Sequence, residues 1–221
     1  MFRLYGMTGA ASLAPHMLFE ELGLPYEFVK LDGDKKEHKS ADYLKLNPHG
    51  RVPTLVHGDM VIYESAAICL YLAEVAQLNA VQSNLLPAAG SPARGQLYKW
   101  LMFLTNTLQP ALMAYFYPER YTTDASHAPA IKEKAEQNAL DYFRQIDQAL
   151  AEQGPFLLGA QASVVDYFAL MLVRWGRWFA TPPVTQFPHI AAYVELMSAK
   201  PAVQRTFAQE GIPAPYCLLP K

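Results

Sequence analysis

Residues 47–68 read NPHGRVPTLVHGDMVIYESAAI, and this stretch determines the architecture of the first part of the chain. Four turn-forming residues, NPHG, precede the short apolar run Val52–His57, and a Gly-Asp pair separates that run from Met60–Tyr63. Two short β-forming runs joined in this way predict a β-hairpin. Glu64 and Ser65 then open an apolar helix, for which Ser65 is a suitable N-cap. The sequence therefore predicts a hairpin followed directly by a helix.

The residues before the hairpin predict a β-α-β unit. Phe2–Tyr5 is a strand-like run, Ser12–Leu22 is a helical stretch that ends at a glycine, and Tyr26–Leu31 alternates as a strand. Ser40–Leu46 adds one or two helical turns, so the order up to Gln77 is β-α-β-α-β-β-α. A β-α-β unit places its two strands in parallel with a right-handed crossover, and the hairpin adds an antiparallel edge. The first part of the chain is therefore predicted to be a small α/β domain.

Beyond the α/β domain the sequence predicts only helices. Apolar residues recur at helical spacing in stretches that cover residues 92–117, 128–153, 163–179, 189–198 and 202–209. Pro110 falls inside the first of them and is expected to kink or break that helix. The predicted organisation is an α/β domain over 1–78, a linker over 79–90 and an all-helical domain over 91–221.

Composition narrows the classes of function. The chain has 221 residues, of which 52% are hydrophobic and 17% charged, so a sizeable core can form. Its formal net charge of −2 lacks the excess of Lys and Arg that binding to nucleic acid or to an anionic membrane requires. Two cysteines cannot form a disulfide framework, so a cytoplasmic location is expected. No transmembrane segment, signal peptide or metal-ligand spacing is recognised.

Three local patterns can carry chemistry, and each also has a purely structural explanation. A cis bond before Pro53 would leave the Val52 backbone free to pair with a peptide-like ligand, or Pro53 is an ordinary edge-strand proline. Glu64 and the amides around Ser65 suit the ammonium and carboxylate of an amino acid, or Ser65 only caps the helix. Ser12, at the start of the first helix, can donate to an anionic sulfur, or it is only a cap.

In this order the patterns resemble those of the cytosolic glutathione transferases, over essentially the whole chain. The stretch from Asn47 to Pro53 is similar to the turn before the family's cis-proline, and Glu64-Ser65 is similar to its pair for the γ-glutamyl group. Ser163–Tyr167 resembles the N-capping box of the family's helical domain, in which an acidic residue reaches back to the cap amide. The resemblance implies an α/β thioredoxin-like N-terminal domain, an all-α C-terminal domain and a homodimer.

Within the family, Gly9–His16 is similar to the first-helix motif of the bacterial beta class. Ala11 stands where that class has a cysteine, so redox chemistry through a protein thiol is not expected. A hydroxyl is expected instead to hydrogen-bond the thiolate of glutathione, with Ser12 as the first candidate and Tyr5 and Thr8 as alternatives. A hydrogen bond to a charged group contributes about 1.5–3 kcal/mol, which lowers the pKa of a thiol by about 1–2 units.

The resemblance also implies the other contacts of the two substrates. Val52 and Pro53 are expected to bind the cysteinyl part of glutathione. Glu64 and Ser65 are expected to bind its γ-glutamyl part, with Arg51 at the border. Lys36 or Lys35 is expected to bind the glycyl carboxylate, with His38 as an alternative. Residues expected to line an electrophile pocket between the domains are Leu13, Tyr115, Phe116, Tyr117, Trp175 and Trp178. The aromatic residues among them fit a helical core as well.

The function implied is that of a glutathione transferase. Glutathione is the co-substrate, no cofactor or metal is expected, and the thiolate attacks a small hydrophobic electrophile, as in detoxification. Two alternatives remain open at this point. One is a glutathione-dependent peroxidase or isomerase on the same site, and the other is a glutathione-binding or interaction module without turnover.

Overall fold

The computed structural model describes residues 1–79 and 84–219, and the chain forms two compact units. The first unit comprises Met1–Leu86 and Ser198–Pro213, and the second comprises Pro87–Met197 and Ala214–Lys221. The segment 198–213 therefore belongs with the α/β unit, whereas the sequence placed it in the helical domain. Within the predicted linker, residues 80–83 lie outside the described residues, and the linker boundaries stay a prediction.

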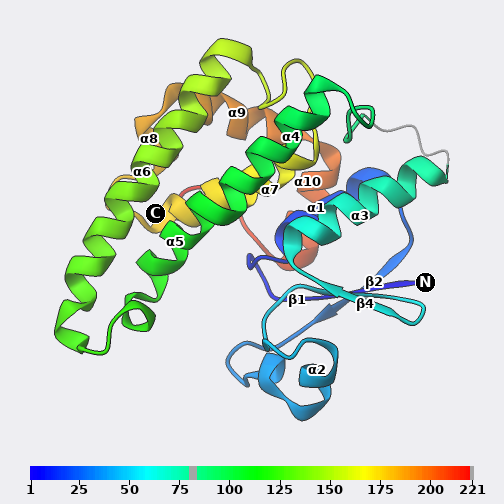
Figure 1. Cartoon of the computed structure of the whole chain (residues 1–221), viewed down its shortest axis with the longest axis horizontal. Helices are drawn as coiled ribbons and strands as arrows, with labels where there is room; N and C mark the ends of the chain where they lie inside the picture. Colours follow the sequence, from blue (N-terminus) through cyan, green and yellow to red (C-terminus); the bar gives the residue numbers. More distant parts are fainter. Residues whose placement is uncertain (80–83, 220–221) are drawn as a thin grey trace. The chain divides into compact units, whose positions relative to one another are not determined.

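The first unit is built on a four-stranded sheet with the strand order β2-β1-β3-β4. Its strands are β1 (Phe2–Gly6), β2 (Tyr26–Lys30), β3 (Thr54–His57) and β4 (Met60–Tyr63). β1 and β2 are parallel, and β3 is antiparallel to both β1 and β4. The parallel pair and the antiparallel hairpin that the sequence predicts are therefore confirmed, and Figure 1 shows them as one twisted sheet.

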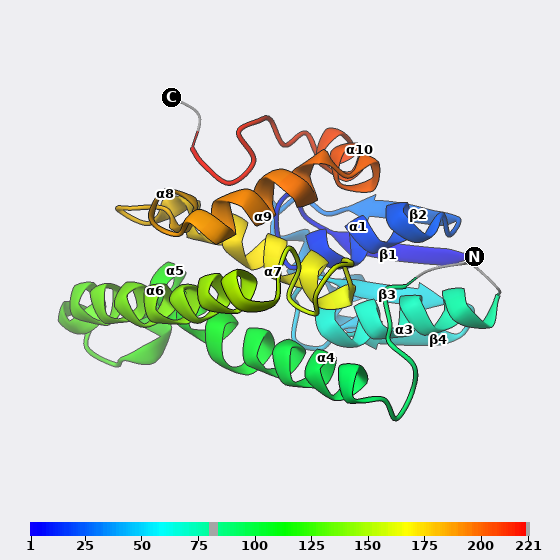
Figure 2. The same ribbon diagram turned by 90° about the horizontal axis from the view of Figure 1, so that it is seen from above.

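Helices cover this sheet on both faces. α1 (Leu13–Leu22) and α3 (Ser65–Leu78) lie on one face (Figures 1 and 2), and α2 (Ala41–Leu46) lies on the other (Figure 1). β1 alternates between buried and exposed side chains, and its buried Phe2 packs against Phe19 of α1 with ring centroids 5.4 Å apart, so the apolar face of the sheet is the one toward α1. α10 (Pro201–Glu210) packs against α1, which brings the last helix of the chain into this unit.

The second unit is helical. Its helices are α4 (Pro92–Phe103), α5 (Gln109–Phe116), α6 (Ala128–Gln153), α7 (Val164–Trp175), α8 (Pro183–Gln186) and α9 (Pro188–Ala199). Short 3₁₀ turns occupy Pro118–Tyr121, Ala125–His127 and Gly176–Trp178, and a further one in the first unit occupies Glu37–Lys39. The sequence did not predict α8, which is only one turn long.

Two predicted helix boundaries have clear physical causes. Pro110 lies in the first turn of α5, and a π-helical segment, Leu104–Leu108, directly precedes that helix. The expected interruption is therefore present, since proline supplies no N–H to the helical ladder. At the start of α7, the Asp166 carboxylate accepts the Ser163 N–H at 2.7 Å and completes the predicted capping box. Every residue of α7 is buried, so this helix forms the centre of the unit.

Candidate functional site

The ends of the four strands bring the predicted site segments together. Thr54, the first residue of β3, pairs with Tyr5 near the end of β1 and with Tyr63 at the end of β4. On the other side of β1, Gly6 pairs with Lys30 at the end of β2. The segments that leave β1, β2 and β4 therefore begin at the same end of the sheet at which β3 starts.

The strand registers also order the groups at this end. Met7 follows the paired Tyr5 by two residues, Val52 precedes Thr54 by two, and Ser65 follows Tyr63 by two, so all three lie just outside this end of the sheet. Neighbouring strands are about 4.8 Å apart, so the paired ends Tyr5, Thr54 and Tyr63 span about 10 Å. An extended tripeptide has about the same length. The three local patterns of the sequence thus adjoin a single row of strand ends at one end of the sheet.

Val52 precedes the central strand end of this row by two residues and offers an open backbone. The Val52-Pro53 bond is cis, which confirms the expectation for this pair. In the described part of the chain, neither the N–H nor the C=O of Val52 has a hydrogen-bond partner. The turn before it is fixed at the Arg51 carbonyl, which accepts bonds from the Tyr43 hydroxyl at 2.6 Å and from the Asn47 amide at 2.9 Å. A rigid turn therefore presents an unpaired donor and acceptor.

Glu64 and Ser65 open α3 in a way that differs from the prediction. Glu64, not Ser65, occupies the N-cap position, and its φ of 76° lies in the left-handed region. Ser65 is the first helical residue and makes no capping bond, so its predicted role as N-cap is wrong. The first backbone bond of the helix runs from the Ile68 N–H to the Glu64 carbonyl, which leaves the amides of residues 65–67 uncovered. A non-glycine residue in this conformation costs about 1–3 kcal/mol, which is typical of ligand sites.

The Met7–Ser12 loop lies between β1 and α1. Ser12 occupies the N-cap position of α1, and the His16 N–H bonds its carbonyl, but its side chain makes no capping bond. Its hydroxyl donates to the Met7 carbonyl at 3.1 Å and accepts the Met7 N–H at 3.2 Å, and the residue is fully buried. Ser12 must leave Met7 before it can donate to a sulfur. The amides of Ala11 and Ser12 have no acceptor among the described residues and lie at the positive end of α1.

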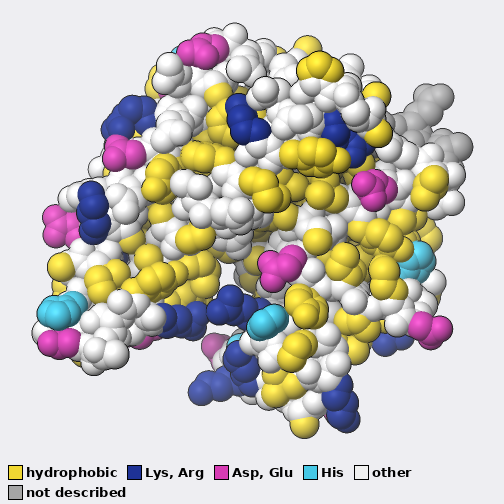
Figure 3. Space-filling view, in the orientation of Figure 1, with side chains coloured by type: hydrophobic (Ala, Val, Ile, Leu, Met, Phe, Trp, Pro, Cys, Tyr) yellow, Lys and Arg dark blue, Asp and Glu magenta, His cyan; other side chains and the backbone are white. Residues whose placement is uncertain are grey.

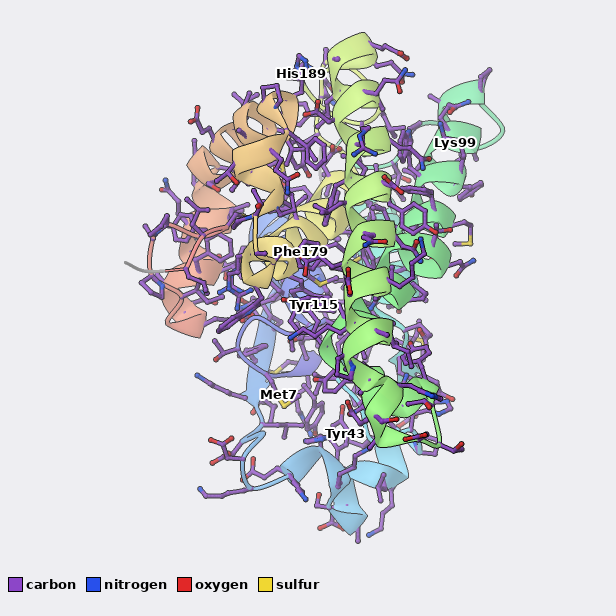
Figure 4. All side chains as sticks on the ribbon, turned by 90° about the vertical axis from the view of Figure 1, so that its left-hand side faces the viewer. Met7, Tyr43, Lys99, Tyr115, Phe179 and His189 are labelled. Atoms are coloured by element: carbon purple, nitrogen blue, oxygen red, sulfur yellow. The ribbon has the colours of Figure 1, made fainter. Side chains whose placement is uncertain are left out.

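The other two candidate hydroxyls have different surroundings. The Tyr5 hydroxyl accepts a bond from Arg3 at 3.3 Å, which directs it back along β1 and away from the loop. Its ring packs edge-on against Tyr43 of α2 (Figure 4 labels Met7 and Tyr43). The Thr8 hydroxyl is in the loop and exposed, and it donates to the Glu210 carbonyl at 3.2 Å. Of the two, only Thr8 lies in the loop.

Glu210 is the site-related residue that the sequence analysis missed. One oxygen of its buried carboxylate accepts the Gly9 N–H at 2.7 Å, and the other lies 2.8 Å from Nδ1 of His16. Nε2 of His16 in turn lies 2.9 Å from the Tyr26 hydroxyl and 2.8 Å from Oε1 of Gln209. No local sequence pattern predicts this role, because the contacts join α10 to the loop between β1 and α1.

The predicted lysines differ in their availability. Lys35 is largely exposed and pairs with Asp32 at 3.2 Å. Lys36 is exposed, has a left-handed backbone with φ of 55° and makes no ion pair among the described residues. Figure 3 shows Lys and Arg side chains around the lobe that contains α2 and the segment before it. Lys36 is therefore better placed than Lys35 to meet an added anion.

Two neighbouring residues complete this basic segment. Lys39, which the sequence analysis did not propose, donates to the His49 carbonyl at 3.2 Å and so lies beside the turn before Val52. Nδ1 of His38 is buried and has no partner among the described residues. Burial lowers the pKa of His38, and the charges of Lys39 and Lys36 add to this effect. A carboxylate would give these groups a partner.

The predicted electrophile residues fall into two groups by exposure. Tyr115 and Trp175 are buried in the helical unit, where Tyr115 packs against Phe179 with ring centroids 4.7 Å apart (Figure 4). Leu13 is fully buried in the first unit, so a contact with a substrate would require it to move. Tyr117 and Trp178 are 39% and 50% exposed, and Phe116 is half-buried. The exposed rings are therefore the ones that offer a free surface.

Within residues 1–79 and 84–219, no group of three or more His, Cys, Asp or Glu side chains is arranged to hold a metal ion. Over the same residues, no helix is both long enough and apolar enough to cross a bilayer. The expectation that no metal is needed stays a prediction.

The chain matches two family models. The one described as "Glutathione S-transferase, N-terminal domain" matches residues 1–74, and the one described as "Glutathione S-transferase, C-terminal domain" matches residues 103–201. Among curated proteins, the chain is 32% identical to glutathione S-transferase 3 of Zea mays, with 96% of each protein covered.

Solved structures agree with this similarity. A glutathione S-transferase from Xylella fastidiosa superposes with a TM-score of 0.86 at 28% identity, covering 96% of this chain and all of the other. A glutathione transferase homologue from Sulfitobacter with bound glutathione also has a TM-score of 0.86, at 25% identity, and covers 96% of this chain and 99% of the other.

Proposed function

The chain belongs to the glutathione S-transferase family, and we propose that it conjugates glutathione to an electrophilic carbon through a thiolate held at the end of its sheet. One observation carries the proposal. The open backbone of Val52 directly precedes β3, whose first residue is paired with the strand ends after which the Met7 loop and the uncovered amides of α3 begin.

The γ-glutamyl part is assigned to Glu64 and Ser65. Its carboxylate accepts from the Ser65 hydroxyl and from the uncovered amides at the positive end of α3. Its ammonium group pairs with the Glu64 carboxylate, which the left-handed backbone presents beside the helix start. Arg51 is exposed at the border of this position and offers a further polar contact.

The other two parts follow along the same row. The cysteinyl backbone pairs with the N–H and C=O of Val52, in the manner of a strand added to a sheet. The glycyl carboxylate meets Lys39 and His38, with Lys36 next to them, rather than Lys35, which already pairs with Asp32. The unsatisfied Nδ1 of His38 supports this choice.

The sulfur is assigned to the amino end of α1. The free amides of Ala11 and Ser12 stabilise the thiolate there, and Glu210 keeps the loop in place through Gly9. The pKa of a thiol is about 8.5 in water, and two amide donors at a helix end are sufficient to lower it by about 1–2 units. Ser12 adds a donor if its hydroxyl leaves Met7. The thiol proton goes to solvent, the sulfur forms a bond to carbon, and the leaving group departs.

The chain's own thiols do not take part. Burial raises the pKa of the Cys69 thiol and raises that of Cys217 to about 12, so neither thiol is a nucleophile near neutrality. Ala11, which we expect to replace a cysteine of the beta class, supplies none either. Both points favour conjugation over disulfide exchange through the protein.

Ultraviolet absorbance of the glutathione thiolate, titrated against pH in the presence of the protein, tests the assignment. We expect the bound thiol to ionise about 1–2 units below its free pKa. Glu64→Gln and Ser65→Ala should weaken binding about tenfold each, since each removes one hydrogen bond to a charged group. Ser91→Ala is the matched control, because Ser91 caps α4 in the other unit. Tight binding of a thiol that keeps its ordinary pKa would instead indicate a binding module.

A homodimer, a cytoplasmic location and a role in detoxification belong to the same proposal. Tyr98 and Met102, both nearly half exposed on α4, give an apolar surface that a second copy can cover. Both cysteines are unpaired, as expected in a reducing compartment. Light scattering of the purified protein tests the dimer directly.

A further inference from the structure

Cations lie over several rings of the predicted electrophile group in the helical unit. The pairs are Lys132 over Tyr115 at 4.7 Å, Arg120 over Tyr117 at 3.8 Å and Arg177 over Trp178 at 5.1 Å from the ring centroid. A cation over an aromatic face is attracted by the ring quadrupole. This part of the unit therefore combines aromatic rings with positive charges.

Arg177 differs from Arg120 and Arg144, which also stack on a ring in this unit. Arg120 is 3.9 Å from the Glu119 carboxylate, and Arg144, which stacks on a ring of its own, is paired with Asp141. In the described part of the chain, no carboxylate forms an ion pair with Arg177. A half-buried cation without a counter-ion is energetically unfavourable, so it favours the binding of an anion.

A second positive charge strengthens this effect. Arg177 donates to the carbonyl of Arg174 at 2.8 Å, which holds it at the carboxyl end of α7. Burial lowers the pKa of Arg177 to about 10, and the charge of Arg174 contributes to the shift. An added anion would relieve both the desolvation and the repulsion.

Trp178 supplies an adjoining flat surface. Its side chain is half exposed, while its carbonyl accepts the Tyr115 hydroxyl at 2.6 Å, so the backbone that carries the indole is fixed. An exposed and fixed indole is suited to stack on an aromatic ligand. A guanidinium presents its donors as a planar fork that matches a carboxylate.

We propose that the electrophilic substrates of this enzyme are aromatic carboxylates, with the carboxylate bound by Arg177 and the ring packed on Trp178. This inference rests on the proposed function, since it names the class of its second substrate. A suitable probe is 4-chloro-3,5-dinitrobenzoate. The thiolate forms a bond to the carbon that bears chlorine, the carbon–chlorine bond breaks, chloride departs, and the carboxylate is unchanged.

The test compares this probe with its neutral carboxamide. The ratio of their kcat/KM values, after subtraction of the uncatalysed rates, should favour the carboxylate. Arg177→Gln should lower this ratio about tenfold or more, as expected for a hydrogen bond to a charged group. Arg177→Lys, which keeps the charge, should lower it less. Arg144→Gln is the matched control, since Arg144 also stacks on a ring but has an acidic partner, and should leave the ratio unchanged.

Calorimetric binding of 3,5-dinitrobenzoate and its carboxamide, without glutathione, separates the two proposals. If the protein prefers the carboxylate and Arg177→Gln abolishes this preference, the Arg177 site is supported. If, in addition, neither chlorinated probe is converted, the proposed function fails while the site stands. Conversion of both chlorides at a ratio that Arg177→Gln does not change overturns the inference and leaves the proposed function intact. Equal binding of carboxylate and carboxamide also overturns it.

Discussion

Glu210 accepts a hydrogen bond of 2.7 Å from the backbone of Gly9, a residue 201 positions earlier in the chain. The same carboxylate contacts His16 of α1, so the last helix fixes both the loop and the helix that follows it. A buried carboxylate is stable only where donors meet it. The position of the Met7–Ser12 loop therefore depends on the hydrogen bonds of the Glu210 carboxylate.

Glu210→Gln should impair glutathione binding. The single accepting oxygen of the amide cannot serve both Gly9 and a donating Nδ1 of His16, so one bond is lost or His16 must change tautomer, at a cost of up to about 2 kcal/mol in the free energy of unfolding. We expect a higher KM for glutathione with a KM for the electrophile close to that of the wild type. Steady-state kinetics and urea denaturation measure the two effects. Glu195→Gln, an exposed change on α9, is the control and should alter neither. An unchanged KM for glutathione would exclude the positioning role.

Ser12→Ala should act through the loop. The change removes two bonds to Met7 and should destabilise the fold by about 1–2 kcal/mol while raising the KM for glutathione. If the amides of Ala11 and Ser12 stabilise the thiolate, the pKa of the bound thiol should rise by less than about one unit. Thr206→Val, which removes another buried hydroxyl of the same unit, is the control. A bound thiol that reverts to its free pKa would identify Ser12 as the donor.

Gly6→Ala should disturb the same loop by overcrowding. A Cβ atom at Gly6 would lie 2.6 Å from Oγ of Ser12 and 2.7 Å from Cε2 of Phe28, so side chains have to shift. We expect a loss of about 1–3 kcal/mol in stability together with weaker glutathione binding. Gly95→Ala is the opposite case, because a Cβ there meets nothing within 4 Å and Gly95 is inside α4. That variant should gain up to about 1 kcal/mol. Similar melting temperatures for the two variants would contradict the argument.

Asp166 should give the stability of the protein a distinct pH dependence. Its burial raises the pKa from 3.8 to about 6, although bonds from Leu157 and Ser163 oppose the shift. The folded state therefore binds this proton more readily than the unfolded state does, and the contribution of Asp166 to stability falls as pH rises from about 4 to about 6. Relative to Asp166→Asn, which does not titrate, the wild type should lose about 3 kcal/mol over this range in urea denaturation. If the wild type instead gains stability relative to Asp166→Asn as the pH rises, the hydrogen bonds to Asp166 affect its pKa more than burial does.

Local patterns in the sequence predicted those features that depend on neighbouring residues. The order of strands and helices from β1 to α3, the cis bond at Pro53, the bounds of α6 and the capping box at Ser163 are all confirmed. Each depends on periodicity or on residue types within a few positions. The Glu64 N-cap is a local feature that the prediction missed, because propensity favours serine there and the structure places a strained acidic residue instead.

Contacts between distant segments could not be predicted in this way. The role of Glu210, the position of Lys39 beside His49 and the burial of Ser12 all arise from tertiary packing. The aromatic residues were recognised as a group, but only the structure separates the buried Tyr115 from the exposed Trp178. The exposure of a side chain depends on the packing of the whole unit, so the sequence pattern does not predict it.

The placement of residues 198–213 in the first unit has a consequence for synthesis of the protein. All four strands leave the ribosome early, yet Gly9 and His16 have no carboxylate to meet until α10 has been translated. Until then, the loop proposed to hold the sulfur lacks its anchor. A nascent chain therefore contains all four strands long before it can bind glutathione well, and the binding competence of the first unit depends on a helix that is translated after α4–α9 of the helical unit.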